Sequence, residues 1–202
     1  MEARISWGNR STVRELVLFL EEPSAKAMLQ GFLPRILPND IYPTYIVFEG
    51  KTDLEKSLPI KLRAWQKPDS IFVVLRDQDS GDCIEIKRKL QRICRQAEKP
   101  NALIRIACRE LESWYIGDLE AVEQGLRISG LSRRYQDKGK FRNPDQLNNA
   151  AEELRKITQF KYQKISGSRR IGVFLDRGRN RSRSFTEFVS GIDHILETLK
   201  TL

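Results

Sequence analysis

The sequence predicts an α/β fold, in which a mostly parallel sheet of about four strands is flanked by helices and followed by a helical C-terminal half. The first half alternates four times between apolar runs of strand length and segments with helical periodicity. The second half has mainly helical patterns. A chain of 202 residues with 40% apolar and 31% charged residues is long enough to bury a substantial core.

Four apolar segments are the expected strands. Residues 16–20 form a continuous apolar run bounded by charged residues, which is typical of a strand covered on both faces. The other three strands are expected at residues 44–50, 71–75 and 101–110.

Helices are expected between these strands, where apolar residues recur at helical spacing. Residues 25–37 carry Met28, Leu29, Phe32 and Leu33, residues 54–65 carry Leu58, Leu62 and Trp65, and residues 82–97 carry Ile84, Leu90 and Ile93. The segment at 54–65 is expected to be helical despite Pro59, and Asp82 is expected to cap the helix that follows it.

The second half predicts two further helices. Asn143-Pro144 is a favourable helix start for residues 145–157, and residues 184–202 form an amphipathic pattern with His194 beside its apolar stripe. We therefore expect an α/β core at 1–118 and a helical region at 119–202, with a basic segment at 161–183, forming one compact domain.

Several classes of protein are unlikely on composition. No apolar run reaches the roughly 18 residues that a membrane span needs, and the N-terminus, "MEARISWGNRS", has no secretory-signal pattern. Three cysteines without a CxxC spacing argue against a disulfide framework, so a cytoplasmic location is expected. The single histidine argues against histidine-based catalysis and leaves carboxylates as the candidate catalytic groups.

Positive charge is concentrated in one segment. The chain has a formal charge of +9, and residues 161–183 contain eight basic residues and one acid, 8 − 1 = +7. Arginine-rich stretches with glycine and serine between them are typical of phosphate-rich partners. A solvated basic loop or a protein contact is the alternative.

Carboxylates follow three of the four predicted strands. They are Glu21-Glu22, Asp77-x-Asp79 and Glu110-x-Glu112. Because the carboxyl ends of parallel strands share one edge, these side chains are expected to converge there, and converging carboxylates call for Mg²⁺ or Mn²⁺. Taken singly, Glu110 and Glu112 could instead stabilise a helix N-terminus.

The stretch "FEGKTD" resembles the opening glutamate motif of Toprim catalytic domains. In those domains a further strand separates the glutamate from the Asp-x-Asp in sequence. Only a helix lies between Glu49 and Asp77, whereas helix, strand and helix lie between Glu21 and the strand that ends at Asp77. Glu21 is therefore the better candidate, and Glu49, Lys51 and Asp53 are accessory residues or a helix start.

The chain as a whole resembles the Toprim-like proteins of domain-of-unknown-function family 4276. The similar blocks are "LEEPSAKAML", "FEGKTDLEKSLPIKLRAW", "VVLRDQDSGDC", "LIRIACRELESWYIGD", "KYQKISGSRRIGVFLD" and "NRSRSFTEFVSGI". Through Toprim, the chain is similar to nucleases of the overcoming-lysogenization-defect type and to effectors that act beside ATPases in bacterial anti-phage defence.

The resemblance implies a role for particular residues. Glu21 takes the place of the Toprim glutamate and Asp77 and Asp79 that of the metal-binding Asp-x-Asp, while Glu22 stands where glycine is usual. Glu110 and Glu112 fall in the family's Arg-Glu-Leu-Glu-x-Trp block. Its basic block is matched by Lys161, Lys164 and Arg169.

The expected function is a Mg²⁺- or Mn²⁺-dependent, Toprim-like (Rossmann-like) nuclease acting on DNA or RNA. Metal would be held by Glu21, Asp77, Asp79 and Glu112, and Glu110 or Glu112 would position water. The expected nucleic-acid-binding residues are Lys51, Lys161, Lys164, Arg169, Arg170, Arg181 and Arg183. A catalytically inactive nucleic-acid-binding or ATPase-partner subunit is the alternative, a glycosyltransferase or phosphotransfer to Asp77 is a remoter one, and homo-oligomerisation is left open.

Overall fold

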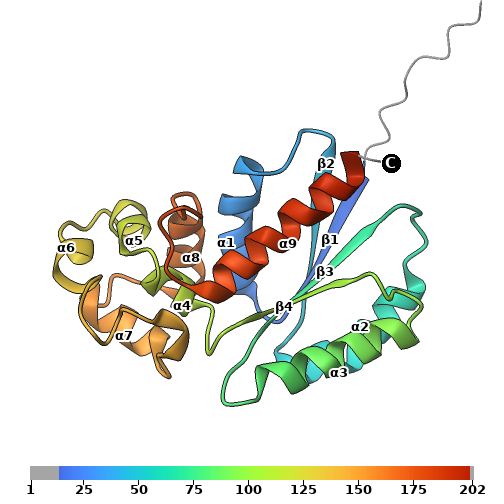
Figure 1. Ribbon diagram of the computed structural model, residues 1–202, viewed down its shortest axis with the longest axis horizontal. Coiled ribbons are helices and arrows are strands. Elements are labelled where there is room, and N and C mark those ends of the chain that lie inside the picture. The colour runs from blue at the N-terminus through green and yellow to red at the C-terminus, as the bar shows by residue number, and fades with distance from the viewer. Residues whose placement is uncertain (1–13, 201–202) are drawn as a thin grey trace, which may run out of the picture.

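The computed structural model describes residues 14–200 and contains one four-stranded parallel sheet (Figure 1). The predicted α/β fold, with four parallel strands and a helical second half, is confirmed. The strands are β1 (Arg14–Leu20), β2 (Ile41–Val47), β3 (Ile71–Asp77) and β4 (Leu103–Ala107), in the spatial order β2-β1-β3-β4. The N-terminal stretch through residue 13 and the last two residues of the predicted C-terminal helix lie outside the described residues.

Helices cover both faces of the sheet, which explains the continuous apolar runs in the strands. One face carries α1 (Pro23–Phe32) and α9 (Arg183–Lys200), and the other carries α2 (Lys51–Ala64) and α3 (Cys83–Gln96) (Figure 1). Along β1, Leu16, Leu18 and Leu20 belong to the first core, whereas Val17 and Phe19 belong to the second. Each strand thus contributes alternate side chains to two separate cores.

All four strands differ in their bounds from the prediction: β1 begins two residues earlier, β3 ends two residues later, and the other two end before the predicted residue. The strand expected at 44–50 is β2, which begins at Ile41 and ends at Val47. The chain turns after it, where Gly50 has a φ of +95° that few other residues tolerate. The strand expected at 101–110 is β4 and ends at Ala107, because Arg109, at a φ of +63°, already turns the chain into the next helix.

The core-facing side of α3 differs from the predicted one. Ile84 was expected to be buried, but it is 57% exposed. Leu90 is buried as predicted and Ile93 is partly buried against the same cluster, and the other buried residues are Ile86 and Cys94, so that the buried positions recur every four residues on one side of the helix. Asp82 caps α3 as predicted, since its Oδ1 accepts hydrogen bonds from the main-chain N–H groups of Ile84 and Glu85 at 2.8 and 2.9 Å.

The second half places five shorter helices beyond the carboxyl ends of the strands, at the left of Figure 1. They are α4 (Glu112–Ile116), α5 (Leu119–Leu126), α6 (Leu131–Tyr135), α7 (Ala150–Ile157) and α8 (Lys164–Gly172), and short 3₁₀ turns occur at Leu33–Arg35 and Pro144–Gln146. The helical half therefore closes over the edge of the sheet where the candidate carboxylates lie.

The predicted start of a helix at Asn143-Pro144 is wrong. Pro144 begins only a 3₁₀ turn, Leu147 is extended, and α7 begins at Ala150. The turn ends early because the Asp145 carboxylate binds the C-terminal part of the chain, accepting hydrogen bonds from the Ser182 hydroxyl at 2.6 Å and the Ser184 N–H at 2.8 Å.

The two halves of the chain share one apolar core. Leu18 of β1, Trp114 of α4, Leu154 of α7 and Phe185 of α9 all belong to the same buried cluster. His194 is exposed on α9, beside the apolar stripe. Within residues 14–200, no helix is both long and apolar enough to cross a membrane.

Candidate functional site

The candidate site lies where the strand order reverses. The chain leaves β1 toward β2 on one side and returns to β3 on the other side, so the carboxyl ends of β1 and β3 mark the position at which ligand sites form in many α/β sheets. Glu21 directly follows β1, and Asp77 ends β3. The Asp77 N–H donates a hydrogen bond of 3.0 Å to Oε2 of Glu21, so the two residues are in direct contact.

Asp77 lies among other carboxylates. Its Oδ2 accepts a hydrogen bond of 3.2 Å from the Leu111 N–H. Burial raises the pKa of Asp77 well above its usual value, and the charges of Glu22, Glu112 and Glu21 raise it further, against the Leu111 N–H. Burial and the neighbouring carboxylates therefore both disfavour the charged form of Asp77.

Glu21 has a raised pKa for a similar reason. Burial is the main cause, the hydrogen bond from Asp77 opposes it, and the charge of Asp79 adds to it. The nearest positive group is the buried guanidinium of Arg76, whose Nε lies 3.8 Å from Glu21 Oε2. Arg76 is itself paired with Glu55 at 2.6 Å, so it is shared between two carboxylates.

Asp79 is held by a lysine from the neighbouring helix. Its backbone has a φ of +55°, and its Oδ2 lies 2.8 Å from the Nζ of Lys51, at the start of α2. The hydrogen bond to Asp79 is the main cause of the raised pKa of Lys51. Lys51, an expected nucleic-acid-binding residue, is thus paired with an expected metal ligand.

Glu22 has a lysine partner too. Its Oε2 lies 2.6 Å from the Nζ of Lys164, and its Oε1 accepts a hydrogen bond of 2.8 Å from the Ser24 hydroxyl. Glu22 stands where the resemblance leads us to expect glycine, and it contributes to the raised pKa of Asp77. Lys164, from the basic segment, partly compensates this additional charge.

Glu112 is buried deepest among the candidate carboxylates, at 1% exposure. It accepts a hydrogen bond of 2.9 Å from the hydroxyl of Tyr162. Burial raises the pKa of Glu112, while the Tyr162 hydrogen bond and the Lys164 charge act in the opposite direction. Sequence reasoning missed Tyr162, although it lies between Lys161 and Lys164 in the basic block, which was the signal available.

The carboxylates of Glu110 and Asp53 accept hydrogen bonds from main-chain N–H groups at the starts of helices. Oε2 of Glu110 accepts a hydrogen bond of 2.8 Å from the N–H of Ala151 in the first turn of α7. Asp53 accepts one of 3.0 Å from the N–H of Glu49, which joins the two ends of the "EGKTD" motif across the start of α2. The contact that the Glu110 carboxylate makes is therefore with the start of α7.

The expected nucleic-acid-binding residues are spread over several places. Lys51 and Lys164 reach the carboxylates, and Lys161 is exposed just before α8. Arg169 donates to the Gln30 side chain at 3.2 Å, and Arg170 lies beside Arg127 at a hollow of about 440 Å³.

The later part of the basic segment lies elsewhere and is mostly paired. Arg181 is 2.8 Å from Asp137, and Arg177 is 2.7 Å from Asp193. Arg179 binds the completely buried carboxylate of Asp118 at 2.7 Å. All three arginines form ion pairs within the chain, and only the pair of Arg179 has a buried partner, which the charge count alone did not predict.

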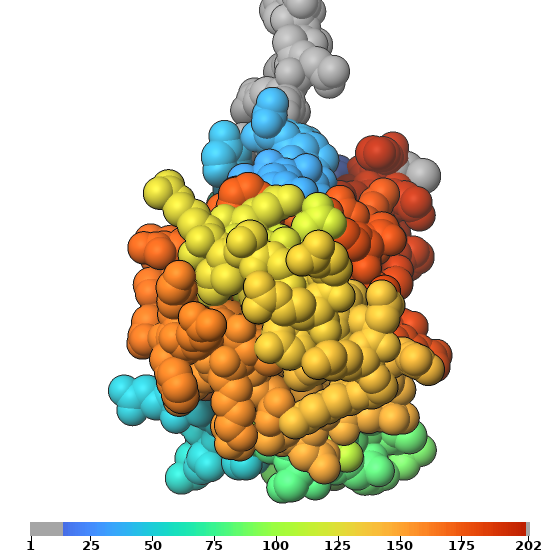
Figure 2. Space-filling model, turned by 90° about the vertical axis from the view of Figure 1, so that its left-hand side faces the viewer, coloured from blue at the N-terminus to red at the C-terminus, as the bar shows by residue number. Residues whose placement is uncertain are grey.

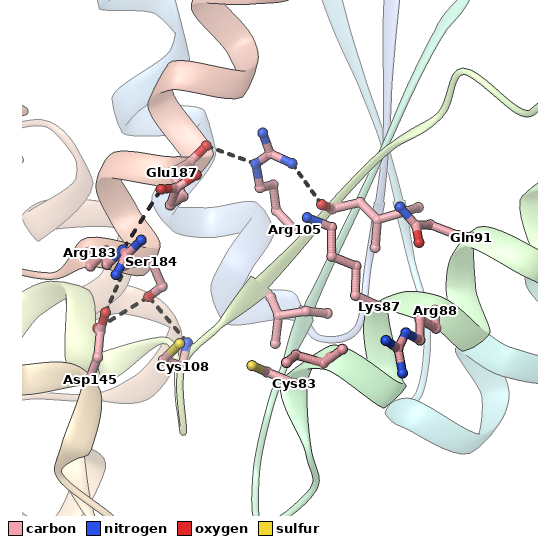
Figure 3. A pocket seen from close by; sticks show the side chains of 13 residues that line it. Cys83, Lys87, Arg88, Gln91, Arg105, Cys108, Asp145, Arg183, Ser184 and Glu187 are labelled. Carbon is pink, nitrogen blue, oxygen red and sulfur yellow. Dashed lines mark hydrogen bonds and ion pairs between the residues drawn. The ribbon is translucent and has the colours of Figure 1, made fainter.

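A groove of about 550 Å³ lies along the free edge of β4, between α3 and α9 (Figure 3). Its lining includes the cysteines Cys83 and Cys108 and the cations Lys87, Arg105 and Arg183. Arg105 covers part of the strand edge, because its guanidinium donates to the Ile104 carbonyl at 2.9 Å and to the Glu187 carbonyl at 2.8 Å. The groove is thus separate in its lining from the carboxylates at the ends of β1 and β3, and it is where Arg183 lies.

A family model described as a domain of unknown function (DUF4276) matches residues 20–193. The chain belongs to this family. The match begins at the last residue of β1 and extends into α9, so it covers the carboxylates and the basic segment alike. No curated protein and no solved structure matches the chain significantly.

Proposed function

We propose that this DUF4276 protein is a divalent-metal-dependent nuclease of the Toprim type, which hydrolyses phosphodiester bonds in DNA or RNA. The observation that carries this proposal is the direct contact between Glu21 and Asp77 at the strand-order reversal, with Asp79 and Glu112 beside them. An ATPase partner in bacterial defence, implied by the family resemblance, is part of the same proposal.

The donor chemistry fits a hard cation such as Mg²⁺ or Mn²⁺, which prefers carboxylate oxygens. The excess negative charge around Asp77 also favours a cation there. Within residues 14–200, no three carboxylate, thiol or imidazole groups are already arranged as a metal site. Glu21, Asp77 and Asp79 would hold the metal once Lys51 leaves Asp79. When bound, a divalent cation supplies an acidic water and neutralises charge on phosphate oxygens.

The lysines of the site have two uses in this proposal. Lys51 and Lys164 come from separate helices and already meet the carboxylates at 2.8 and 2.6 Å. A phosphate group that enters the site could replace the carboxylates as the partner of these ammonium groups. The lysines would then bind the nucleic-acid backbone and stabilise the negative charge that develops during hydrolysis. Lys161 and Arg169 would extend the contact along the polymer, without sequence preference.

Cleavage of labelled DNA and RNA in Mn²⁺ or Mg²⁺ tests the proposal. We expect the wild-type chain to cleave at least one of them and Asp77→Asn to lose at least 100-fold in rate, about the loss when a charge-stabilising group is removed. Asp82→Asn is the matched control, because Asp82 lies five positions away but serves only as a helix cap. Equal rates for wild type and Asp77→Asn would rule out the assigned site.

A second candidate function is a catalytically inactive, nucleic-acid-binding partner of an ATPase. The observation that favours it is that Lys51 and Lys164 already neutralise Asp79 and Glu22, two carboxylates that a metal would otherwise compensate. Calorimetric titration separates the two functions: nucleic-acid binding without any Mn²⁺ binding supports this candidate, and Mn²⁺ binding that depends on Asp77 supports the nuclease.

A further inference from the structure

Phe160 is an aromatic side chain that is 71% exposed to solvent. It follows α7 in a left-handed conformation, with a φ of +62°, and Gln159 before it has a φ of +52°. A bulky residue rarely adopts such a conformation, because its Cβ crowds the carbonyl oxygen. The fold therefore presents an aromatic ring to water from a backbone conformation that does not suit it.

The turn that carries Phe160 is fixed by hydrogen bonds. The N–H of Phe160 donates to the Arg155 carbonyl at 2.7 Å, and the Gln163 side chain donates to the Phe160 carbonyl at 3.3 Å. The next N–H, that of Lys161, donates to the Thr158 carbonyl at 3.1 Å. Phe160 is thus presented by an ordered turn.

The same turn is anchored to the carboxylate site. Tyr162, two residues after Phe160, donates its hydroxyl to Glu112 at 2.9 Å, and Lys164 lies 2.6 Å from Glu22. Two residues span at most about 7 Å of extended chain, so the backbone of Phe160 lies close to that of an anchor residue. The turn that exposes the ring is therefore joined, within two residues, to a side chain that contacts the site.

The surroundings of Phe160 combine positive charge and apolar surface. Lys161 is exposed and forms no ion pair within the described part of the chain, and Ile165 is 52% exposed. The orange segment of Figure 2, which includes α7 and the turn after it, makes up much of the face that the helical half presents. A basic surface with aromatic side chains is the pattern by which proteins bind single strands, because each base has a face that can stack.

We propose that Phe160 is a stacking platform for an unpaired base, which makes single-stranded nucleic acid, or a single-stranded stretch within a larger molecule, the substrate class of this site. In a duplex the base faces are stacked on each other, so an exposed ring finds no partner there. This inference rests on the proposed function in one respect, namely that nucleic acid occupies the carboxylate site.

Binding measured without cleavage tests the inference. Fluorescence anisotropy in chelator, with a labelled single strand of about 12 nucleotides and the matching duplex, compares the full-length wild type with Phe160→Ala. We expect Phe160→Ala to weaken single-strand binding by about 5- to 150-fold, the range for the loss of one stacked base, and to leave duplex binding unchanged. Phe160→Trp keeps a stacking ring and should retain the affinity.

Ile60→Ala is the control for exposed apolar surface, since Ile60 is 65% exposed on α2. It should not change the affinity for either strand form. An equal effect of Phe160→Ala on both forms, or no effect on either, would overturn the stacking role. So would a Phe160→Ala variant whose only defect is the loss of a protein partner in pull-down experiments.

The two proposals can fail separately. If single-strand binding depends on Phe160 but the protein never cleaves, the nuclease proposal is wrong and the stacking proposal is retained. If cleavage depends on Asp77 but is equal for single strands and duplex, in the wild type and in Phe160→Ala alike, the stacking proposal is wrong and the nuclease proposal is retained. No binding to any nucleic acid removes both.

Discussion

Asp77 donates its main-chain N–H to Oε2 of Glu21 over 3.0 Å, which joins the ends of two strands that are 56 residues apart in sequence. Both residues are partly buried, and the charges of Glu22 and Glu112 act on the Asp77 carboxylate as well. Charge repulsion of this kind destabilises the folded state, and proteins retain it at sites where a ligand offsets it.

Asp77→Asn should therefore stabilise the protein in chelator. Asparagine keeps an oxygen that can accept the hydrogen bond from Leu111 but removes the charge, so we expect the free energy of unfolding to rise by about 1 kcal/mol. Urea denaturation in EDTA measures this change. A less stable Asp77→Asn variant would show that the carboxylate charge is already compensated within the protein.

The same pair of proteins tests the effect of metal. Mn²⁺ at about 100 times its dissociation constant should raise the free energy of unfolding of the wild type by about 2.7 kcal/mol. A ligand that binds only the folded state stabilises it by an amount set by the logarithm of its concentration relative to the dissociation constant. The Asp77→Asn variant should show little of this effect, while Asp82→Asn should behave as the wild type does.

The position of the site could be predicted from the sequence, because it follows from topology. Once four strands are expected to be parallel, residues that follow them, such as Glu21 and Asp77, must lie at the edge formed by the carboxyl ends of the strands. This placement does not depend on side-chain conformation. What could not be predicted is which cation meets which carboxylate. The pairing of Lys51 with Asp79, 28 residues apart, and that of Arg179 with Asp118, 61 residues apart, depend on how helices pack on the sheet.

The errors within helices have a similar cause. Ile84 follows an apolar pattern, yet α3 packs on the sheet through Ile86, Leu90 and Cys94, and Ile84 lies outside that contact. Asn143-Pro144 has the local features of a helix start, but the Asp145 carboxylate binds Ser182, which is distant in sequence. In both places the local signal for a helix was correct in kind, and the packing of the folded chain decided which residues the helix buries or where it begins.

Arg179 should matter for stability more than its neighbours in the basic segment. The Asp118 side chain is completely buried, and Arg179 donates to its two oxygens at 2.7 and 3.1 Å. Arg179→Leu leaves this carboxylate with only main-chain donors, so we expect a loss of about 2–4 kcal/mol in urea denaturation. Arg177→Leu breaks only the exposed pair with Asp193 and should cost less than about 1 kcal/mol. Equal losses would contradict an internal role for Arg179.

Cys94 should make the stability depend on pH in alkaline solution. Burial raises the pKa of its thiol from 9.0 to about 11. The folded protein therefore keeps the proton between these values while the unfolded chain releases it. Its contribution is fully present below about pH 9 and is lost as the pH rises toward 11, by up to about 2–3 kcal/mol.

Urea denaturation at pH 8 and near pH 10.5 measures this loss. The Cys94→Ala variant lacks the thiol and should lose less stability between the two pH values than the wild type. Since the cost of the missing side chain is the same at both pH values, it cancels in the comparison. Parallel losses in the two proteins would show that another group is responsible.

The packing of α8 against α1 depends on Gly172. A Cβ added at this position would collide with the main-chain carbonyl of Met28 in α1, and backbone atoms cannot move aside as a flexible side chain can. Gly172→Ala should therefore cost about 1–3 kcal/mol of stability, as overpacking in a close helix contact does. Gly139→Ala is the matched control, because a Cβ at Gly139 would meet nothing within 4 Å. Since α8 also carries Lys164, the Gly172→Ala variant should lose the proposed nuclease activity together with stability. Unchanged stability would contradict the close packing of α8 on α1 at this position.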